Sequence, residues 1–224
     1  ILGGTFGSRC VTGMLDPDIP GYAEKLAKFG CSPEKAKAAK RDISKYECYL
    51  EYHIEQGDKL DHTGIDVGVV SGIVSIIDYK VTAKGMSNHA GTTMMANRKD
   101  ALVGMAKLIV AAEARARELN DTLVFTVGKI SVSPGQENVI PGQAVANFEM
   151  RHMDKAVTDQ FYADIQALAK EIPNCEFEFV NTGAKYSTPC DPRLIKLIDD
   201  VCTEKEISHI IMPSGAGHDA RSEE

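Results

Sequence analysis

The residues from Ile73 to Val180 carry a series of hydrophobic periods that strongly restricts the fold of this 224-residue chain. Alternating or β-rich segments predict strands at 73–84, 122–132, 143–151 and 175–180. Apolar residues at steps of three and four predict helices over 102–116 and 157–172. The order β-α-β-β-α-β is typical of a ferredoxin-like unit, in which two helices cover one face of an antiparallel sheet.

The segments on either side of this unit are too short to form domains alone. Short helices are predicted at 20–29 and 33–43, the second with Ser32 as N-cap and Pro33 at the first helical position. Asp191-Pro192 repeats this start signal before another helix. We therefore expect an α/β fold in which one domain is interrupted by the βαββαβ unit, with boundaries at 1–75, 76–186 and 187–224.

Composition excludes several classes of partner. The formal charge of -7 and the lack of a basic cluster argue against nucleic acid. The longest apolar stretch, Val67 to Ile77, is interrupted by glycine and serine and is too short to span a membrane. No signal peptide is recognised, and the 6 cysteines form no C-x-x-C pair. We expect free thiols and a cytoplasmic location.

Four packets of polar residues contain glycines that allow close approach of the backbone. They are His53-Ile54-Glu55-Gln56-Gly57, Asn88-His89-Ala90-Gly91-Thr92-Thr93, Asn138-Val139-Ile140-Pro141-Gly142, and Ser214-Gly215-Ala216-Gly217-His218-Asp219-Ala220. Half of the 6 histidines lie in them. We expect the packets to come together as one polar, metal-bearing site.

Each packet also has an ordinary structural interpretation. His53, after an apolar run, is expected at the end of an element, where histidines often cap or pack. Glu55 and Gln56 beside it are expected either to orient a ligand histidine or to face solvent. His218 is flanked by glycines, and Asp219 could hold its ring through the second nitrogen.

The other two packets and Arg151 leave similar alternatives. The residues after His89 could cap the following helix, and Asn138 precedes a turn signal. Arg151 ends a predicted strand, where a guanidinium either binds a carboxylate at two points or is solvated.

Taken in order, the four packets and Arg98-Lys99-Asp100-Ala101-Leu102 resemble the N-carbamoyl-L-amino-acid hydrolase and allantoate amidohydrolase family. This family lies in the aminoacylase-like clan of dinuclear metallohydrolases, and the resemblance runs from about Gly3 to Ala220. It implies a catalytic α/β domain interrupted by a lid that also forms a homodimer. It further implies hydrolysis of a linear C–N amide or ureido bond, with ammonia released from an N-carbamoyl-L-amino acid or allantoate.

The resemblance also implies cofactors and residue roles. The cofactors are two divalent ions of zinc, manganese or cobalt. His53 and His218 match metal ligands, and His89 matches a lid histidine that polarises the scissile carbonyl. The positions matching substrate-binding residues are Gln56, Asn138, Arg151, Gly215 and Ala216, with Arg151 binding the substrate carboxylate.

The chain departs from the family pattern near its first residues. Ile1 and Leu2 stand where the family has two glutamates, and an upstream histidine and bridging aspartate have no counterpart. Thr5 and Met94 replace a family arginine and proline. We therefore expect a fragment of a longer amidohydrolase with an incomplete metal site. The alternatives are a non-catalytic dimerisation module and a related aminoacylase or dipeptidase, although the His-Ile-Glu-Gln-Gly packet favours the carbamoylase branch.

Overall fold

The computed structural model describes residues 5–16 and 18–222, so Ile1 and Leu2, where the family glutamates would stand, lie outside the described residues. The chain divides into two compact units. Unit 1 comprises residues 1–69, 198–210 and 216–224, and unit 2 comprises residues 70–197 and 211–215. The functional boundaries at 1–75, 76–186 and 187–224 remain a prediction.

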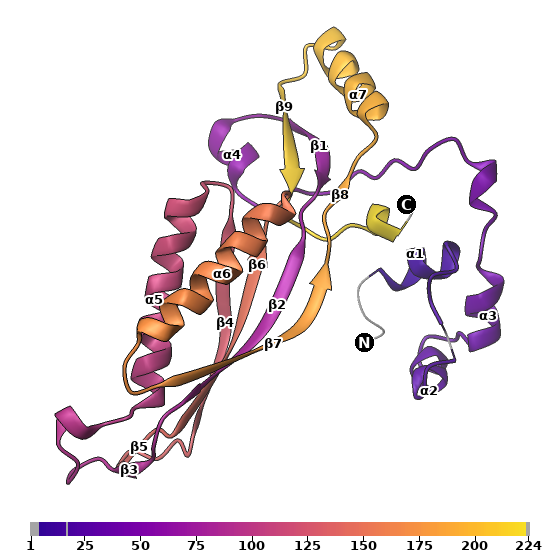
Figure 1. Ribbon diagram of the computed structural model, residues 1–224. Coiled ribbons are helices and arrows are strands. Elements are labelled where there is room, and N and C mark those ends of the chain that lie inside the picture. Colours follow the sequence, from indigo (N-terminus) through magenta and orange to yellow (C-terminus); the bar gives the residue numbers. More distant parts are fainter. Residues whose placement is uncertain (1–4, 17, 223–224) are drawn as a thin grey trace. The chain divides into compact units, whose positions relative to one another are not determined.

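Unit 2 is built on a four-stranded antiparallel sheet. Its strands are β2 (Ile76–Lys84), β4 (Val124–Ser133), β6 (Gln143–Arg151) and β7 (Glu176–Lys185), in the spatial order β4-β6-β2-β7. Helices α5 (Ala101–Leu119) and α6 (Lys155–Glu171) lie along one face of this sheet (Figure 1). The predicted β-α-β-β-α-β order is confirmed.

The core of unit 2 follows directly from the predicted periods. In β6 every second side chain is buried, from Ala144 to Met150. These side chains pack against the apolar faces of the two helices, which include Met105, Leu108, Phe161 and Ile165. Both helices begin at an aspartate whose carboxylate accepts backbone N–H groups, Asp100 for α5 and Asp154 for α6.

The structure differs from the predicted strands at two places. The strand expected over 73–84 is broken, because β1 (Val67–Ile73) ends and β2 begins on either side of Ser75. The Ser75 N–H and hydroxyl both donate to the carbonyl of His152, at 2.9 and 2.8 Å. Strand β7 continues to Lys185, five residues beyond the predicted end at Val180.

Several short strands had no predicted counterpart. Strands β3 (Asn88–His89) and β5 (Val139–Ile140) pair with each other. A three-stranded sheet has the order β8-β1-β9, with β8 at Thr188–Pro189 and β9 at His209–Ser214. Helix α7 (Pro192–Glu204) begins where the sequence predicts, and the Asp191 carboxylate accepts the Arg193 N–H at 2.8 Å.

Unit 1 includes several short helices besides the second half of α7. They are α1 (Phe6–Val11), α2 (Tyr22–Ala27), α3 (Pro33–Ala38), η1 (Ile43–Lys45), α4 (Lys59–Thr63) and η3 (Asp219–Ser222). The two predicted helices exist but are shorter than expected, and Ser32 caps α3 by accepting the Lys35 N–H. A cluster of four buried side chains, Cys10, Leu15, Leu26 and Ala36, forms its core.

Three further observations complete the fold. All six cysteines are free, as predicted. Residues 48–55 form neither helix nor strand, so the expectation that His53 ends such an element is wrong. No helix among the described residues is long and apolar enough to cross a membrane.

Candidate functional site

Glu51, His53 and His218 form a compact group of potential metal ligands within unit 1. One ligand atom from each residue lies within 4.8 Å of the other two. The two imidazole rings meet edge to face, with centroids 4.2 Å apart and planes inclined by 70°. Two predicted ligands, far apart in the sequence, are therefore brought together with a third.

Backbone contacts fix two members of this group. His53 Nδ1 lies 2.6 Å from the carbonyl oxygen of Ile54 and would donate its proton there, which leaves the Nε2 lone pair for a ligand. Glu51 Oε2 accepts the N–H of Ala220 at 2.8 Å, and Glu51 Oε1 lies 3.9 Å from His218 Nδ1. This contact ties the extended segment around Glu51 to the start of η3, beside His218.

Burial favours the neutral form of the His218 side chain. Its side chain is only 8% exposed. Burial lowers the pKa of His218, the neighbouring charge of His53 lowers it further, and Glu51 acts in the opposite direction. A lowered pKa keeps His218 neutral at physiological pH, which is the form that ligates a metal.

The donor set fits one divalent ion. Two imidazoles and a carboxylate suit zinc, manganese or cobalt. In a tetrahedral zinc site, donor atoms 2.0–2.1 Å from the ion lie about 3.4 Å apart, so this group would contract by up to about 1.4 Å. Among the described residues this is the one group of three such ligands. A second ion would need donors from outside this set.

Other residues of the same packets take structural roles. Asp219 Oδ1 accepts a hydrogen bond from the Ser8 hydroxyl at 2.8 Å, and an additional role in holding the His218 ring remains a prediction. Glu55 does not orient His53, because its carboxylate accepts the Lys59 and Leu60 N–H groups at the start of α4. Gln56 is exposed and has a φ of 54°, a conformation that non-glycine residues seldom adopt. Its role in substrate binding remains a prediction.

The structure brings the predicted residues His89 and Asn138 together at the β3–β5 pair. The Ala90 N–H donates to the Asn138 carbonyl at 2.9 Å. The Gly91 N–H donates to His89 Nδ1 at 3.1 Å, which places the ring proton on Nε2. A Cβ atom at Gly91 would lie 3.1 Å from the His89 ring, so this position favours glycine. His89 is thus held as a donor suited to a carbonyl oxygen.

The Arg98 motif supports the same loop. Arg98 Nη2 donates to the Ala90 carbonyl at 2.5 Å, and Nε donates to the Thr93 carbonyl at 3.2 Å. Met94, where the family has proline, is exposed in this loop. The conformation around His89 therefore depends on a guanidinium from the following segment.

Arg151 and Gly215 form a third group, within unit 2. Arg151 Nη1 donates to the Gly215 carbonyl at 2.7 Å, and the same guanidinium pairs with Glu149. The expectation of a simply solvated strand-end arginine is therefore wrong. A Cβ at Gly215 would meet no atom within 4 Å, so close approach does not explain that glycine. Close approach does explain the glycine at position 142, because a Cβ there would lie 2.9 Å from the Ser87 nitrogen. Substrate binding by Ala216 remains a prediction.

The two groups in unit 2 lie at opposite ends of β6. Asn138 precedes Gln143, where β6 begins, and Arg151 is its last residue. At about 3.3 Å per residue, the ends of this strand are roughly 26 Å apart. The expectation of one site from all four packets is thus not met within unit 2. The sheet that the sequence correctly predicts is what keeps these residues apart.

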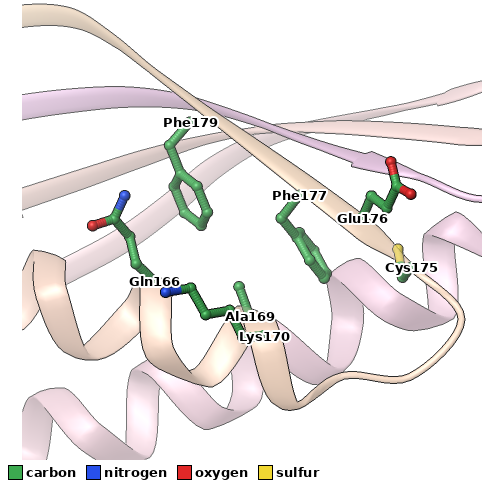
Figure 2. A pocket seen from close by; sticks show the side chains of 7 residues that line it. All are labelled: Gln166, Ala169, Lys170, Cys175, Glu176, Phe177 and Phe179. Atoms are coloured by element: carbon green, nitrogen blue, oxygen red, sulfur yellow. The ribbon is translucent and has the colours of Figure 1, made fainter.

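A cavity of about 330 Å³ lies elsewhere, between α6 and β7 (Figure 2). Its walls include Lys170, Cys175 and Phe177, and burial raises the pKa of the Cys175 thiol. None of the predicted site residues lines it. It carries no part of the proposed chemistry.

Sequence analysis missed Glu51. The available signal was its spacing from His53, because residues two apart in an extended chain project on the same side. A Glu-x-His pair on an extended segment is therefore a candidate ligand pair. The distance to His218 could be known only from the fold.

Comparison with known protein families identifies the class of domain to which unit 2 belongs. The family described as peptidase dimerisation domain matches residues 71–174. These residues include all of α5, β4, β6 and α6. Unit 2 therefore carries a dimerisation domain of the peptidase type.

Full-length relatives extend the match to almost the whole chain. The allantoate amidohydrolase of Escherichia coli is 31% identical over 96% of this chain and 55% of its own length. The N-carbamoyl-L-amino-acid amidohydrolase of a Pseudomonas species is 33% identical over 97% of this chain and 56% of its own length. An amidase of the hydantoinase/carbamoylase family from Burkholderia phymatum has 30% identity and a TM-score of 0.81, covering 97% of this chain and 57% of that one.

This chain belongs to the hydantoinase/carbamoylase family of amidohydrolases, as its motifs predict. It spans about half the length of the curated relatives it matches.

Proposed function

We propose that this chain carries part of a metal-dependent amidohydrolase that cleaves a linear C–N bond in an N-carbamoyl-L-amino acid or allantoate. The observation that carries the proposal is the Glu51–His53–His218 group, found in a chain whose relatives are named for these two activities. The catalytic protein would have the length of those relatives.

For an N-carbamoyl amino acid, the overall reaction consumes one water molecule. The ureido group is converted to ammonia and carbon dioxide, and the amino acid is released with a free amino group. A ureido carbonyl is a poor electrophile because both attached nitrogens donate electron density into it. The site must therefore polarise the carbonyl oxygen and activate water.

Different residues would perform the separate parts of this reaction. Glu51, His53 and His218 would hold a divalent ion, which when bound polarises the carbonyl and lowers the pKa of water. The Nε2–H of His89 would donate to the carbonyl oxygen as negative charge develops there. Arg151 would bind the substrate carboxylate, and Asn138 would hold the substrate beside His89.

Pairing of two copies through unit 2 would bring distant groups into one site. The dimerisation-domain match supports this pairing. The length of β6 adds a reason, because it separates His89 and Asn138 from Arg151 and Gly215 within one copy. In a homodimer, His89 of one copy could act beside Arg151 of the other.

A second candidate function is dimerisation without catalysis. The dimerisation-domain match favours it, as does the presence of a single three-ligand group among the described residues where the family uses two ions. Sedimentation equilibrium tests it directly. A chain that stays monomeric at high micromolar concentration would rule out this second function.

The proposed hydrolase is tested with the protein extended to the length of its relatives. It would be loaded with manganese, cobalt or zinc and given N-carbamoyl-L-alanine, allantoate, N-acetyl-L-alanine or a dipeptide. We expect ammonia from a ureido substrate and its loss in His218→Ala. Cleavage of only N-acetyl-L-alanine or the dipeptide would indicate an aminoacylase or dipeptidase instead. No ammonia from either ureido substrate with any of the three metals would contradict the proposal.

A further inference from the structure

We propose that Glu149 is a positioning residue that fixes the guanidinium of Arg151 side-on, so that the terminal nitrogens remain available for the substrate carboxylate. This inference rests on the proposed function, since it assumes that Arg151 binds that carboxylate. Glu149 stands in none of the motifs that predict the site.

The hydrogen bonds of Arg151 leave a defined part of its donor set. Glu149 Oε1 accepts from Arg151 Nε at 2.8 Å and lies 2.7 Å from Nη2. The Gly215 carbonyl accepts from Nη1 at 2.7 Å. A guanidinium has five N–H donors. Among the described residues, hydrogen bonds use one donor each on Nε and Nη1 and the ion pair engages Nη2, so at least one N–H remains on each terminal nitrogen.

The two remaining donors match a carboxylate. Carboxylates bind arginine best through two parallel N–H···O bonds, and the terminal nitrogens form such a fork. Glu149 occupies the other fork, made by Nε and Nη2. A glutamate that prevented Arg151 from binding a substrate carboxylate would instead contact the fork formed by the two terminal nitrogens. The observed side is therefore the one expected for support.

The strand makes this support rigid. Glu149 and Arg151 lie two residues apart on β6, so both side chains project from the same face of the sheet. They are partly buried, with side-chain exposures of 33% and 29%. Partial burial strengthens a charged hydrogen bond relative to a fully solvated pair.

A second carboxylate borders this pair. Asp78 of β2 is directly opposite Glu149 in the strand register. Burial raises the pKa of Asp78, the charge of Glu149 raises it further, and Arg151 and Lys185 lower it. Glu149 therefore has a second carboxylate on the neighbouring strand, in addition to its contact with Arg151.

The test measures binding of N-carbamoyl-L-alanine by calorimetry to the metal-free protein extended to the length of its relatives, with ethylurea as a probe that lacks the carboxylate. We expect Glu149→Ala to weaken binding of N-carbamoyl-L-alanine about tenfold. Glu149→Gln keeps an acceptor for the side-on fork, so it should restore part of that loss. Glu178→Gln is the matched control, because Glu178 pairs with Lys84 on the same sheet at 2.7 Å. It should bind like the wild type, and ethylurea binding should not change in any variant.

A second measurement follows the Nε–H resonance of Arg151 by NMR. It should exchange slowly in the wild type and in Glu149→Gln, and rapidly in Glu149→Ala while the remaining spectrum stays folded. If Arg151→Ala weakens binding but Glu149→Ala leaves it unchanged or tightens it, the positioning role is wrong and the role of Arg151 stands. If the wild type does not bind N-carbamoyl-L-alanine, or Arg151→Ala binds it equally well, the role of Arg151 in the proposed function fails and this inference fails with it.

Discussion

The two units of this chain distribute stability and chemistry differently. Unit 2 has an extensive core in which the alternate side chains of β6 pack against two long helices. Unit 1 has a small core cluster of four buried side chains and mostly short helices, yet it holds the Glu51–His53–His218 group. In unit 1 several large apolar side chains are exposed, including Tyr52 at 99% and Ile54 at 72%. The group of candidate metal ligands therefore lies in the unit with the smaller core cluster.

The largest expected loss of stability comes from a substitution in the core of unit 2. Phe161 is fully buried and packs edge to face against Phe125. Phe161→Ala should lower the free energy of unfolding of unit 2 by about 3–5 kcal/mol, because it leaves a cavity. Urea denaturation followed by circular dichroism measures this. Phe29→Ala, at a side chain 71% exposed, is the matched control and should change stability by less than about 0.5 kcal/mol. Equal effects of the two changes would mean that unit 2 lacks the packed core described above.

A second change tests unit 1 alone. Leu26 is fully buried in its small core, so Leu26→Ala should cost about 2–5 kcal/mol in that unit. Hydrogen exchange should show α1, α2 and α3 losing protection while α5 and α6 keep theirs. Equal loss of protection in α5 and α6 would show that the units unfold together, which would overturn the comparison.

A third and smaller effect compares helix caps. Asp100 accepts two backbone N–H groups at the start of α5, at 3.0 and 3.1 Å, whereas Ser32 accepts one at the start of α3. Asp100→Ala should cost about 1 kcal/mol, and Ser32→Ala the same or less. Thermal unfolding of both variants measures the difference. A larger loss for Ser32→Ala would contradict the assignment of these caps.

The smallest effect depends on pH. Because the pKa of Asp78 is raised above its ordinary value, the folded state holds this proton more tightly than the unfolded state. Its contribution to stability therefore falls as pH rises from the ordinary value through the raised one. Asp78→Asn should remove that fall and raise stability at neutral pH by no more than about 0.5 kcal/mol. Denaturation at pH 3 and pH 7 tests this, with the exposed Asp121→Asn as control. A lower stability of Asp78→Asn at pH 7 would contradict the assignment.

For physical reasons, the sequence predicts the long β6 strand of unit 2 better than the short or interrupted strands of the same unit. The strand at 143–151 coincides with β6, because its alternation matches burial on one face. The β3–β5 pair has strands of two residues, too short to show any period. The predicted strand over 73–84 failed at Ser75, where a tertiary contact with His152 overrides local preference.

The sequence predicts which residues belong to the site, but it does not predict how they are arranged in space. His53 and His218 belong to the predicted packets and do meet, whereas Glu51 belongs to none of them and is linked to Ala220 by a contact that only the fold provides. The hydrogen bond from Ser8 to Asp219 could not be predicted from the packet, because Ser8 lies 211 residues away in the sequence. Which distant residues share a site depends on tertiary contacts that the packets themselves do not encode.

The central claim is that Glu51, His53 and His218 bind one divalent ion. Elemental mass spectrometry on the purified chain, after dialysis against zinc and then metal-free buffer, tests it most directly. We predict one ion per chain in the wild type and in the control His62→Ala, and near zero in Glu51→Ala and His218→Ala. No bound zinc in the wild type, or unchanged zinc in both site variants, would contradict the account.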